Sequence, residues 1–135
     1  MIWVNARSRG RERREALLNA EGGVVSSTQL AELLGLSRRA VDRRRRKGEL
    51  LALRSGGRAY RYPVWQLDDG KTLSGVEELL AALEDHDPWL KLSFFVRKHS
   101  RLQDARSLDI LRDGSEAGLR RVFEAAKSYS EHRGD

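Results

Sequence analysis

Seven of the ten residues from 38 to 47 carry a positive charge, against a single acid at Asp42. The seven are Arg38, Arg39, Arg43, Arg44, Arg45, Arg46 and Lys47. Like charges at this density destabilise a helix unless an anion neutralises them. Guanidinium groups bind phosphate oxygens through paired hydrogen bonds, and they bind guanine edges in a major groove with similar geometry. The segment therefore favours binding to a polyanion such as duplex DNA; the alternative is a charged helix face that contacts only water.

Two short helices separated by a glycine are predicted to position these charges. Ser26 and Gln29 have the spacing of a capping box at the start of the first helix. The side chains expected to share its buried face are Leu30, Leu33 and Leu34. Gly35 is expected to end this helix, Ser37 to cap the second helix, and Gly48 to end it. Such a pair, with a strongly basic second helix, is typical of a helix-turn-helix.

Helical spacing divides the second helix into two faces. Val41 is expected to contact the first helix. The outward face then holds Arg39, Asp42, Arg43 and Arg46. Arg44 and Arg45 lie nearer the buried side, where their aliphatic stems cover apolar surface while the guanidinium groups reach water. The side chains of this helix predicted to contact DNA are Arg38, Arg39, Arg43, Arg46 and Lys47.

A β-hairpin is predicted directly after the second helix. Residues 50–54 and 58–62 alternate in character on either side of a Ser-Gly-Gly loop that tolerates positive φ. Pro63 is expected to end the second strand because it has no N–H to donate. Tyr60 is expected either to contact DNA or to join the core. The hairpin cations predicted to hold phosphates are Arg54, Arg58 and Arg61.

Residues 26–62 resemble the winged helix-turn-helix heads of MerR-like and excisionase-like proteins. The matching residues run from Gln29 to Ser37, include Val41, and run again from Gly48 to Leu53. Residues 9–20 precede this head and carry both arginines and leucines. They are expected either to form a helix that packs on the head or to act as a basic arm that contacts phosphates.

Charge is divided unevenly along the 135 residues. Residues 1–66 hold 15 Lys/Arg against 6 Asp/Glu, a balance of +9, whereas residues 67–135 hold 11 against 14, a balance of −3. The front half is therefore expected to meet polyanions and the back half is not. The chain has no cysteine, which excludes disulfides and cysteine-bound zinc, and no apolar run that approaches a membrane span. We expect a cytoplasmic, nucleoid-associated protein with no membrane partner.

Helical periodicity continues after a turn at residues 68–70. Ser74 and Glu77 have capping-box spacing at the start of a helix, and its apolar stripe is Val76, Leu79, Leu80 and Leu83. Asp87 and Pro88 form a strong helix start; the apolar side chains that follow on one face are Trp89, Leu92, Phe95 and Val96, with Phe94 to the side. Ser107 and Ser115 are expected to cap two more helices, so the segment reads as four short helices without strands.

This second half resembles the toxin-binding domain of Xre/MbcA/ParS-type antitoxins. The resemblance rests on Asp87-Pro88-Trp89, Phe94-Phe95, Leu102, Arg106 to Leu111, Gly114, Val122 and Ala125 to Tyr129. It implies an antitoxin that neutralises an NAD-consuming or ADP-ribosylating toxin and represses its own operon. A homodimer is expected because one short head makes a small DNA interface and two half-sites add affinity and specificity. The residues that the resemblance assigns to toxin binding or dimerisation are Trp89, Phe94, Phe95, Leu108, Phe123, Tyr129, His132 and Arg133. The alternative is a stand-alone DNA-binding regulator or architectural factor whose helical domain only self-associates.

Enzyme chemistry finds little support in the sequence. His86, His99 and His132 have no spacing that gathers metal ligands, and each is expected to face solvent. No glycine-rich phosphate loop and no nucleophile elbow are present, so we expect neither catalysis nor a cofactor. The sequence predicts a mainly α protein: residues 1–66 form a winged helix-turn-helix head with a small β-hairpin, and residues 67–135 form a compact helical domain.

Overall fold

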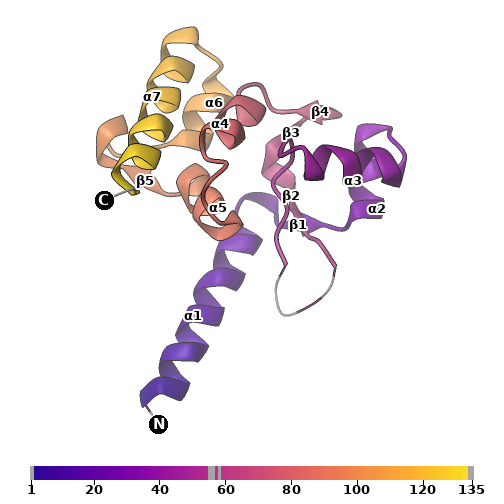
Figure 1. The fold of residues 1–135 in the computed structure, drawn as a ribbon, viewed down its shortest axis with the longest axis horizontal. Helices are drawn as coiled ribbons and strands as arrows, with labels where there is room; N and C mark the ends of the chain where they lie inside the picture. The colour runs from indigo at the N-terminus through magenta and orange to yellow at the C-terminus, as the bar shows by residue number, and fades with distance from the viewer. Residues whose placement is uncertain (1, 55–56, 58, 134–135) are drawn as a thin grey trace.

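The computed structural model describes residues 2–54, 57 and 59–133, and it is mainly helical, as predicted (Figure 1). Its α-helices are α1 (Ile2–Asn19), α2 (Ser27–Leu34), α3 (Arg38–Arg46), α4 (Val76–Ala82), α5 (Pro88–Val96), α6 (Ser107–Asp113) and α7 (Glu116–Arg133). The strands are two residues long and pair antiparallel: β1 (Val24–Val25) with β2 (Tyr62–Pro63), β3 (Leu67–Asp68) with β4 (Lys71–Thr72), and β5 (Lys98–His99) with β6 (Ala105–Arg106). In Figure 1, α2 and α3 lie on one side of the β1–β2 pair and α4 to α7 lie on the other.

The α2–α3 pair forms as its caps predict. Ser26 Oγ accepts a hydrogen bond from Gln29 N (3.1 Å) while Gln29 Oε1 accepts one from Ser26 N (2.9 Å), so the capping box is complete. Gly35 ends α2 at φ 66°, a left-handed conformation that glycine adopts without strain. Ser37 Oγ accepts from Ala40 N (3.1 Å) at the start of α3.

One expected core position of α2 is wrong. Leu33 is 49 % exposed, whereas Leu30 and Ala31 are buried and Leu34 is half-buried. The buried face of α2 is thus centred on Leu30, Ala31 and Leu34, and Leu33 falls at its edge because of the 100° step between successive helical residues.

The wing, defined as residues 50–62, is shorter in its pairing than predicted. Its two sides meet at one bridge, where Leu53 N donates to Arg61 O (2.9 Å) and Arg61 N donates to Leu53 O (2.8 Å). Pro63 ends this pairing as expected, yet the strand itself continues through Pro63 on its other edge, where β2 pairs with β1. There Val64 N donates to Gly23 O (3.0 Å). Because Val64 provides this hydrogen bond between the strands, none is needed from the nitrogen of Pro63. The partner strand β1 was not predicted.

A buried glutamine completes the wing where the proline cannot. The register of the Leu53–Arg61 bridge places Leu51 opposite Pro63. Gln66, which is fully buried, accepts from Leu51 N (2.9 Å) and donates to both Leu51 O (2.9 Å) and Pro63 O (3.1 Å). Its amide side chain therefore takes the place of a strand residue beside Leu51 and satisfies backbone groups that would otherwise be orphaned in the core.

Two apolar cores meet at the wing. The smaller core consists of Leu30, Ala31, Val41, Leu50 and Tyr62. The main core gathers side chains of α4 to α7 together with four residues that precede the predicted boundary at 66/67: Leu18, Leu51, Leu53 and Trp65. The neighbouring wing residues Leu50 and Leu51 thus pack into different cores. Leu18 also ties the C-terminal end of α1 to this core, and α1 contacts α5.

Four sequence-based details of the part that follows the head are wrong. Gly75, not Ser74, is the N-cap residue of α4, at φ 95°, and a Cβ there would lie 2.6 Å from Leu119 Cδ1. Ser107 does not cap α6 but is its first residue, buried, and its Oγ donates to Phe94 O (3.1 Å). The short β5–β6 pair interrupts a segment expected to lack strands, and α7 is long. The expected stripe of α4 is correct, since all four of its side chains are buried.

An ion-pair cluster joins the turn after α1 to α6. Arg106 forms a bidentate contact with Asp109: Nε donates to Oδ2 (2.8 Å) and Nη2 donates to Oδ1 (2.7 Å). Its Nη1 donates to Glu21. Arg112 Nη1 donates to the second oxygen of Glu21 at 3.0 Å. The hydrogen bonds from Arg106 and Arg112 lower the pKa of Glu21, and the hydrogen bond from Arg106 lowers the pKa of Asp109.

Glu21→Gln should lower the free energy of unfolding at neutral pH by about 1 kcal/mol, because the variant keeps the shape and loses the charge. The folded-state pKa of Glu21 lies below its unfolded value, so its stabilisation is complete above the unfolded pKa and disappears as the pH falls through the folded one. Urea unfolding at a series of pH values should therefore show the difference between wild type and variant shrinking in acid. Glu12→Gln, at an exposed position of α1, is the control and should change little.

Candidate nucleic-acid interface

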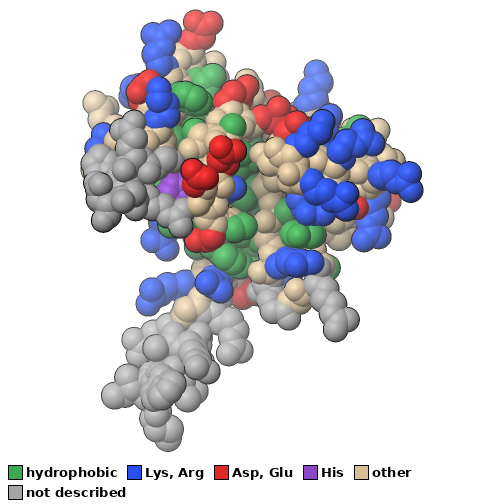
Figure 2. Space-filling view, viewed as in Figure 1, with side chains coloured by type: hydrophobic (Ala, Val, Ile, Leu, Met, Phe, Trp, Pro, Cys, Tyr) green, Lys and Arg blue, Asp and Glu red, His purple; other side chains and the backbone are tan. Residues whose placement is uncertain are grey.

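The exposed side of α3 presents five cations. They are Arg38, Arg39, Arg43, Arg46 and Lys47, all exposed. Within the described part of the chain, none of their side chains forms a hydrogen bond or an ion pair. Val41 is fully buried against α2, so helical spacing directs Arg39, Arg43 and Arg46 outward from the domain. Figure 2 shows the resulting cluster of basic side chains over α3.

The two remaining arginines of α3 are less exposed, and Arg45 has a structural role. Arg44 and Arg45 are half-buried, as helical spacing predicts. The Arg45 guanidinium lies over the Tyr60 ring, with Cζ 4.0 Å from the ring centroid, and it is 3.9 Å from Asp42. Arg54 of the wing lies over the same ring at 4.5 Å. Tyr60 therefore connects the C-terminal part of α3 to the wing through two cation–π contacts.

Tyr60→Leu should weaken DNA binding about tenfold, because both arginines lose the ring that orients them, and each exposed cation–π contact is worth about 0.5–1 kcal/mol. Fluorescence anisotropy with labelled duplex DNA measures the loss. Tyr60→Phe keeps the ring face and should bind as the wild type does. Equal weakening by both variants would assign the effect to the hydroxyl group and not to the cation–π contacts.

The wing cations predicted to hold phosphates do not all share the α3 face. Arg54 is exposed and lies on the Tyr60 side. Arg61 is directed toward α1, where its Nη1 is 3.9 Å from Glu15 Oε1. Arg58 lies outside the described residues. Tyr62, the other tyrosine of the wing, is fully buried in the smaller core, with its hydroxyl 3.5 Å from Ser27 Oγ.

The residues assigned to toxin binding or dimerisation divide by burial. Phe94, Phe95 and Leu108 are buried in the main core and are not available to a partner as the fold stands. The half-buried members are Trp89, Phe123 and Tyr129. The side chains of His132 and Arg133 lie outside the described residues. The surface open to a partner on α5 and α7 is thus smaller than the resemblance implied.

Two histidines expected in solvent are packed against aromatic rings. His86 is only 4 % exposed, and its ring centroid is 5.3 Å from that of Tyr129. His99 is half-buried, with its ring 4.7 Å from Phe94 and its Nε2 2.8 Å from Phe94 O. Neither position shows in the sequence because His86 falls in a turn and His99 in the two-residue strand β5, where helical periodicity gives no burial signal.

Comparison with known proteins agrees with the geometry of the α2–α3 unit. Residues 24–69 match the family model described as "Helix-turn-helix domain". Among solved structures, the NMR structure of Rv2175c has a similar fold, with a TM-score of 0.60, 23% sequence identity, and coverage of 81% of this chain and 84% of that chain. At this identity the likeness concerns the fold alone. No curated protein matches the chain.

No helix in the described part of the chain has the length and apolarity to cross a bilayer. The matched segment contains α2, α3, the wing and β2, which together carry the five exposed cations of α3 and the Tyr60 contact. Residues 24–69 are therefore a helix-turn-helix DNA-binding domain, and this domain points to a DNA-binding regulator.

Proposed function

We propose that the protein is a transcription regulator that inserts α3 into a major groove of operator DNA and holds the adjacent backbone with the wing. The observation that carries the proposal is the set of five exposed cations on α3, for which the described residues provide no carboxylate partner. Arg39, Arg43 and Arg46 are placed at the centre of this face and are the residues we assign to base edges. Arg38, Lys47 and Arg54 flank them and are assigned to phosphates.

We further propose that the regulator binds as a homodimer. A single α3 contacts only a few base pairs, and one small module buries a modest area against DNA. Two copies on half-sites about one helical turn apart add both affinity and specificity. The helical part, α4 to α7, is then the segment that joins the copies. Sedimentation of the protein with and without operator DNA measures the stoichiometry, and one protein per duplex would contradict the dimer.

Selection of bound duplexes from a random library tests the function directly. We expect enrichment of a short sequence, with binding at least about 10³-fold tighter than to unrelated duplex at the same salt concentration. The logarithm of the affinity should fall linearly with the logarithm of salt concentration, and Lys47→Ala should reduce the slope by about 1. Enrichment of no sequence, with strong salt dependence, would instead support an architectural DNA-binding protein.

A second function, neutralisation of a toxin by the helical part, is favoured by one observation. Trp89 on α5 and Phe123 and Tyr129 on α7 are aromatic and only half-buried, and such side chains are frequent anchors of protein interfaces. The protein would then be an antitoxin and autorepressor of the type resembled in sequence. Co-expression with the proteins encoded beside it, followed by pull-down, tests this; retention of none of them leaves DNA regulation as the function.

A further inference from the structure

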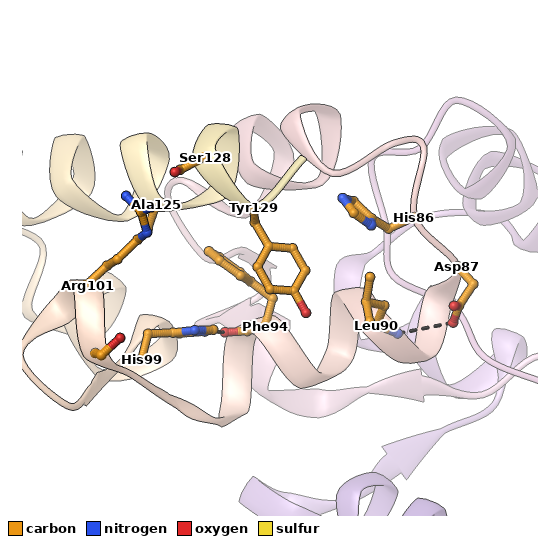
Figure 3. A pocket seen from close by; sticks show the side chains of 10 residues that line it. His86, Asp87, Leu90, Phe94, His99, Arg101, Ala125, Ser128 and Tyr129 are labelled. Carbon is orange, nitrogen blue, oxygen red and sulfur yellow. Dashed lines mark hydrogen bonds between the residues drawn. The ribbon is translucent and has the colours of Figure 1, made fainter. Parts of the chain in front are cut away.

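A cavity of about 650 Å³ opens on the helical part, between α5, the segment after β5 and α7 (Figure 3). Its lining includes four rings, a cation and a hydroxyl group, from His86, Phe94, His99, Tyr129, Arg101 and Ser128. The volume falls within the range of small-molecule sites, about 300–1,000 Å³. In Figure 1, α7 and β5 lie at the opposite end of the molecule from α3, so the cavity is separate from the DNA-binding face.

Four rings form a continuous wall of this cavity. Tyr129 meets Phe94 edge-on, with ring centroids 5.7 Å apart. His99 lies 4.7 Å from Phe94, and His86 lies 5.3 Å from Tyr129. Figure 3 shows Tyr129 and Phe94 in the centre, with His86 beyond one side and Arg101 beyond the other. Tyr129 and His99 are half-buried, and their ring planes meet at 80°, so a planar group stacked on Tyr129 would turn its edge toward His99.

Polar groups accompany this wall. The Phe94 carbonyl accepts from His99 Nε2, which fixes the proton on that nitrogen in the neutral ring and leaves Nδ1 as a hydrogen-bond acceptor. Arg101 is exposed at the rim, and within the described residues no carboxylate pairs with it. A ligand ring with an N–H edge and an attached anion would match both groups.

A second hollow continues from the first and is strongly basic. It measures about 540 Å³ and shares Arg101, Ala125 and Ser128 with the cavity. Its other charged lining residues are Arg120, Arg121, Lys127 and Glu124. Four cations against one acid give a local balance of +3, whereas residues 67–135 as a whole carry 11 cations against 14 acids, or −3. Lys127 already pairs with Glu124 at 3.6 Å, and Asp87 lines the first cavity. The two hollows together therefore hold four cations against two acids, a balance of +2, so more than one negative charge is needed to match them.

We propose that this double cavity binds a nucleotide: the base stacks on Tyr129 with its edge toward His99, and the phosphates lie against Arg101, Arg120 and Arg121. The proposal goes beyond DNA binding by α3 and does not depend on it. A planar ring and a multiply charged anion in one molecule are what the aromatic wall and the basic hollow together select. An aromatic carboxylate would satisfy the wall but would leave most of the cations unmatched.

Isothermal titration calorimetry of the full chain tests the proposal, with AMP, GMP, CMP, UMP, ADP and GDP as nucleotides and with the four corresponding nucleosides and inorganic phosphate as partial ligands. We expect at least one nucleotide to bind at least tenfold tighter than its nucleoside and than phosphate. Arg101→Ala with Arg121→Ala should weaken that binding at least tenfold, and Ser128→Trp should abolish it by filling the cavity. Arg97→Ala, at an exposed arginine outside the lining, should leave it unchanged.

Circular dichroism and operator binding, both expected to match the wild type, show that the variants remain folded. Three results would overturn the proposal: no nucleotide of the panel binding below 1 mM ligand, binding of phosphate or nucleoside as tight as that of the nucleotide, or binding that survives both the double arginine variant and Ser128→Trp. Loss of nucleotide binding with intact operator binding separates this site from the proposed function.

Discussion

Replacing Arg43 and Arg46 together by alanine should weaken binding to the selected operator by about 2–6 kcal/mol, since each arginine that reads a base edge contributes about 1–3 kcal/mol. Both side chains are exposed at the centre of the outward face of α3, and neither pairs with a carboxylate in the described chain. The substitutions remove no buried contact, and alanine favours the helix. Fluorescence anisotropy at fixed salt concentration measures the change, and thermal unfolding should show no loss of stability.

The matched control removes the same amount of charge elsewhere. Arg97→Ala with Lys98→Ala deletes two exposed cations at the end of α5 and in β5, far from α3 in Figure 1. This variant should bind the operator within about twofold of the wild type, because charges beyond a Debye length of about 8–10 Å are largely screened. If the two double variants lose equal affinity, binding depends on overall charge and α3 is not the reading helix.

Gln66→Leu should lower the free energy of unfolding by about 3 kcal/mol, because each buried backbone group left without a partner costs about 1–3 kcal/mol. The glutamine is fully buried and makes three hydrogen bonds, two with Leu51 and one with Pro63 O. Leucine fills nearly the same space but satisfies none of them. Urea denaturation measures the loss, which should appear in thermal unfolding as a decrease of roughly 10 °C in Tm.

Gln29→Leu is the comparison for this substitution. Gln29 is exposed and contributes only the side-chain half of the α2 capping box, so its loss should stay below about 1 kcal/mol. If Gln66→Leu proves no more costly than Gln29→Leu, the Leu51 backbone groups find other partners and the wing does not depend on this side chain.

The local parts of the fold followed from the sequence. Ser26, Gly35 and Ser37 act as caps and stops where their types predicted, because these effects involve backbone groups within four residues. The half-burial of Arg44 and Arg45 followed from helical spacing alone. The basic face of α3, on which the candidate interface depends, is local information of the same kind.

What failed depends on contacts between distant residues. Two residues, Val24 and Val25, are too short a run to predict a strand from sequence. They form β1 because they pair with the edge of β2. Ser107 has the type of an N-cap, but the approach of Phe94 O draws its hydroxyl into the core. The position of His86 against Tyr129 likewise depends on how α7 crosses the turn before α5. Such pairings are set by packing, which residue type and periodicity do not encode.

The wing contributes side chains to both cores, and this limits how the protein can be divided into separate domains. Residues 24–69 cut out alone would carry Leu51, Leu53 and Trp65 into water, since the side chains that cover them belong to α4 to α7 and α1. An excised DNA-binding segment is therefore expected to aggregate. A related protein with a different domain in place of α4 to α7 would need a new apolar surface of the same shape against the wing, so the two halves are expected to evolve together.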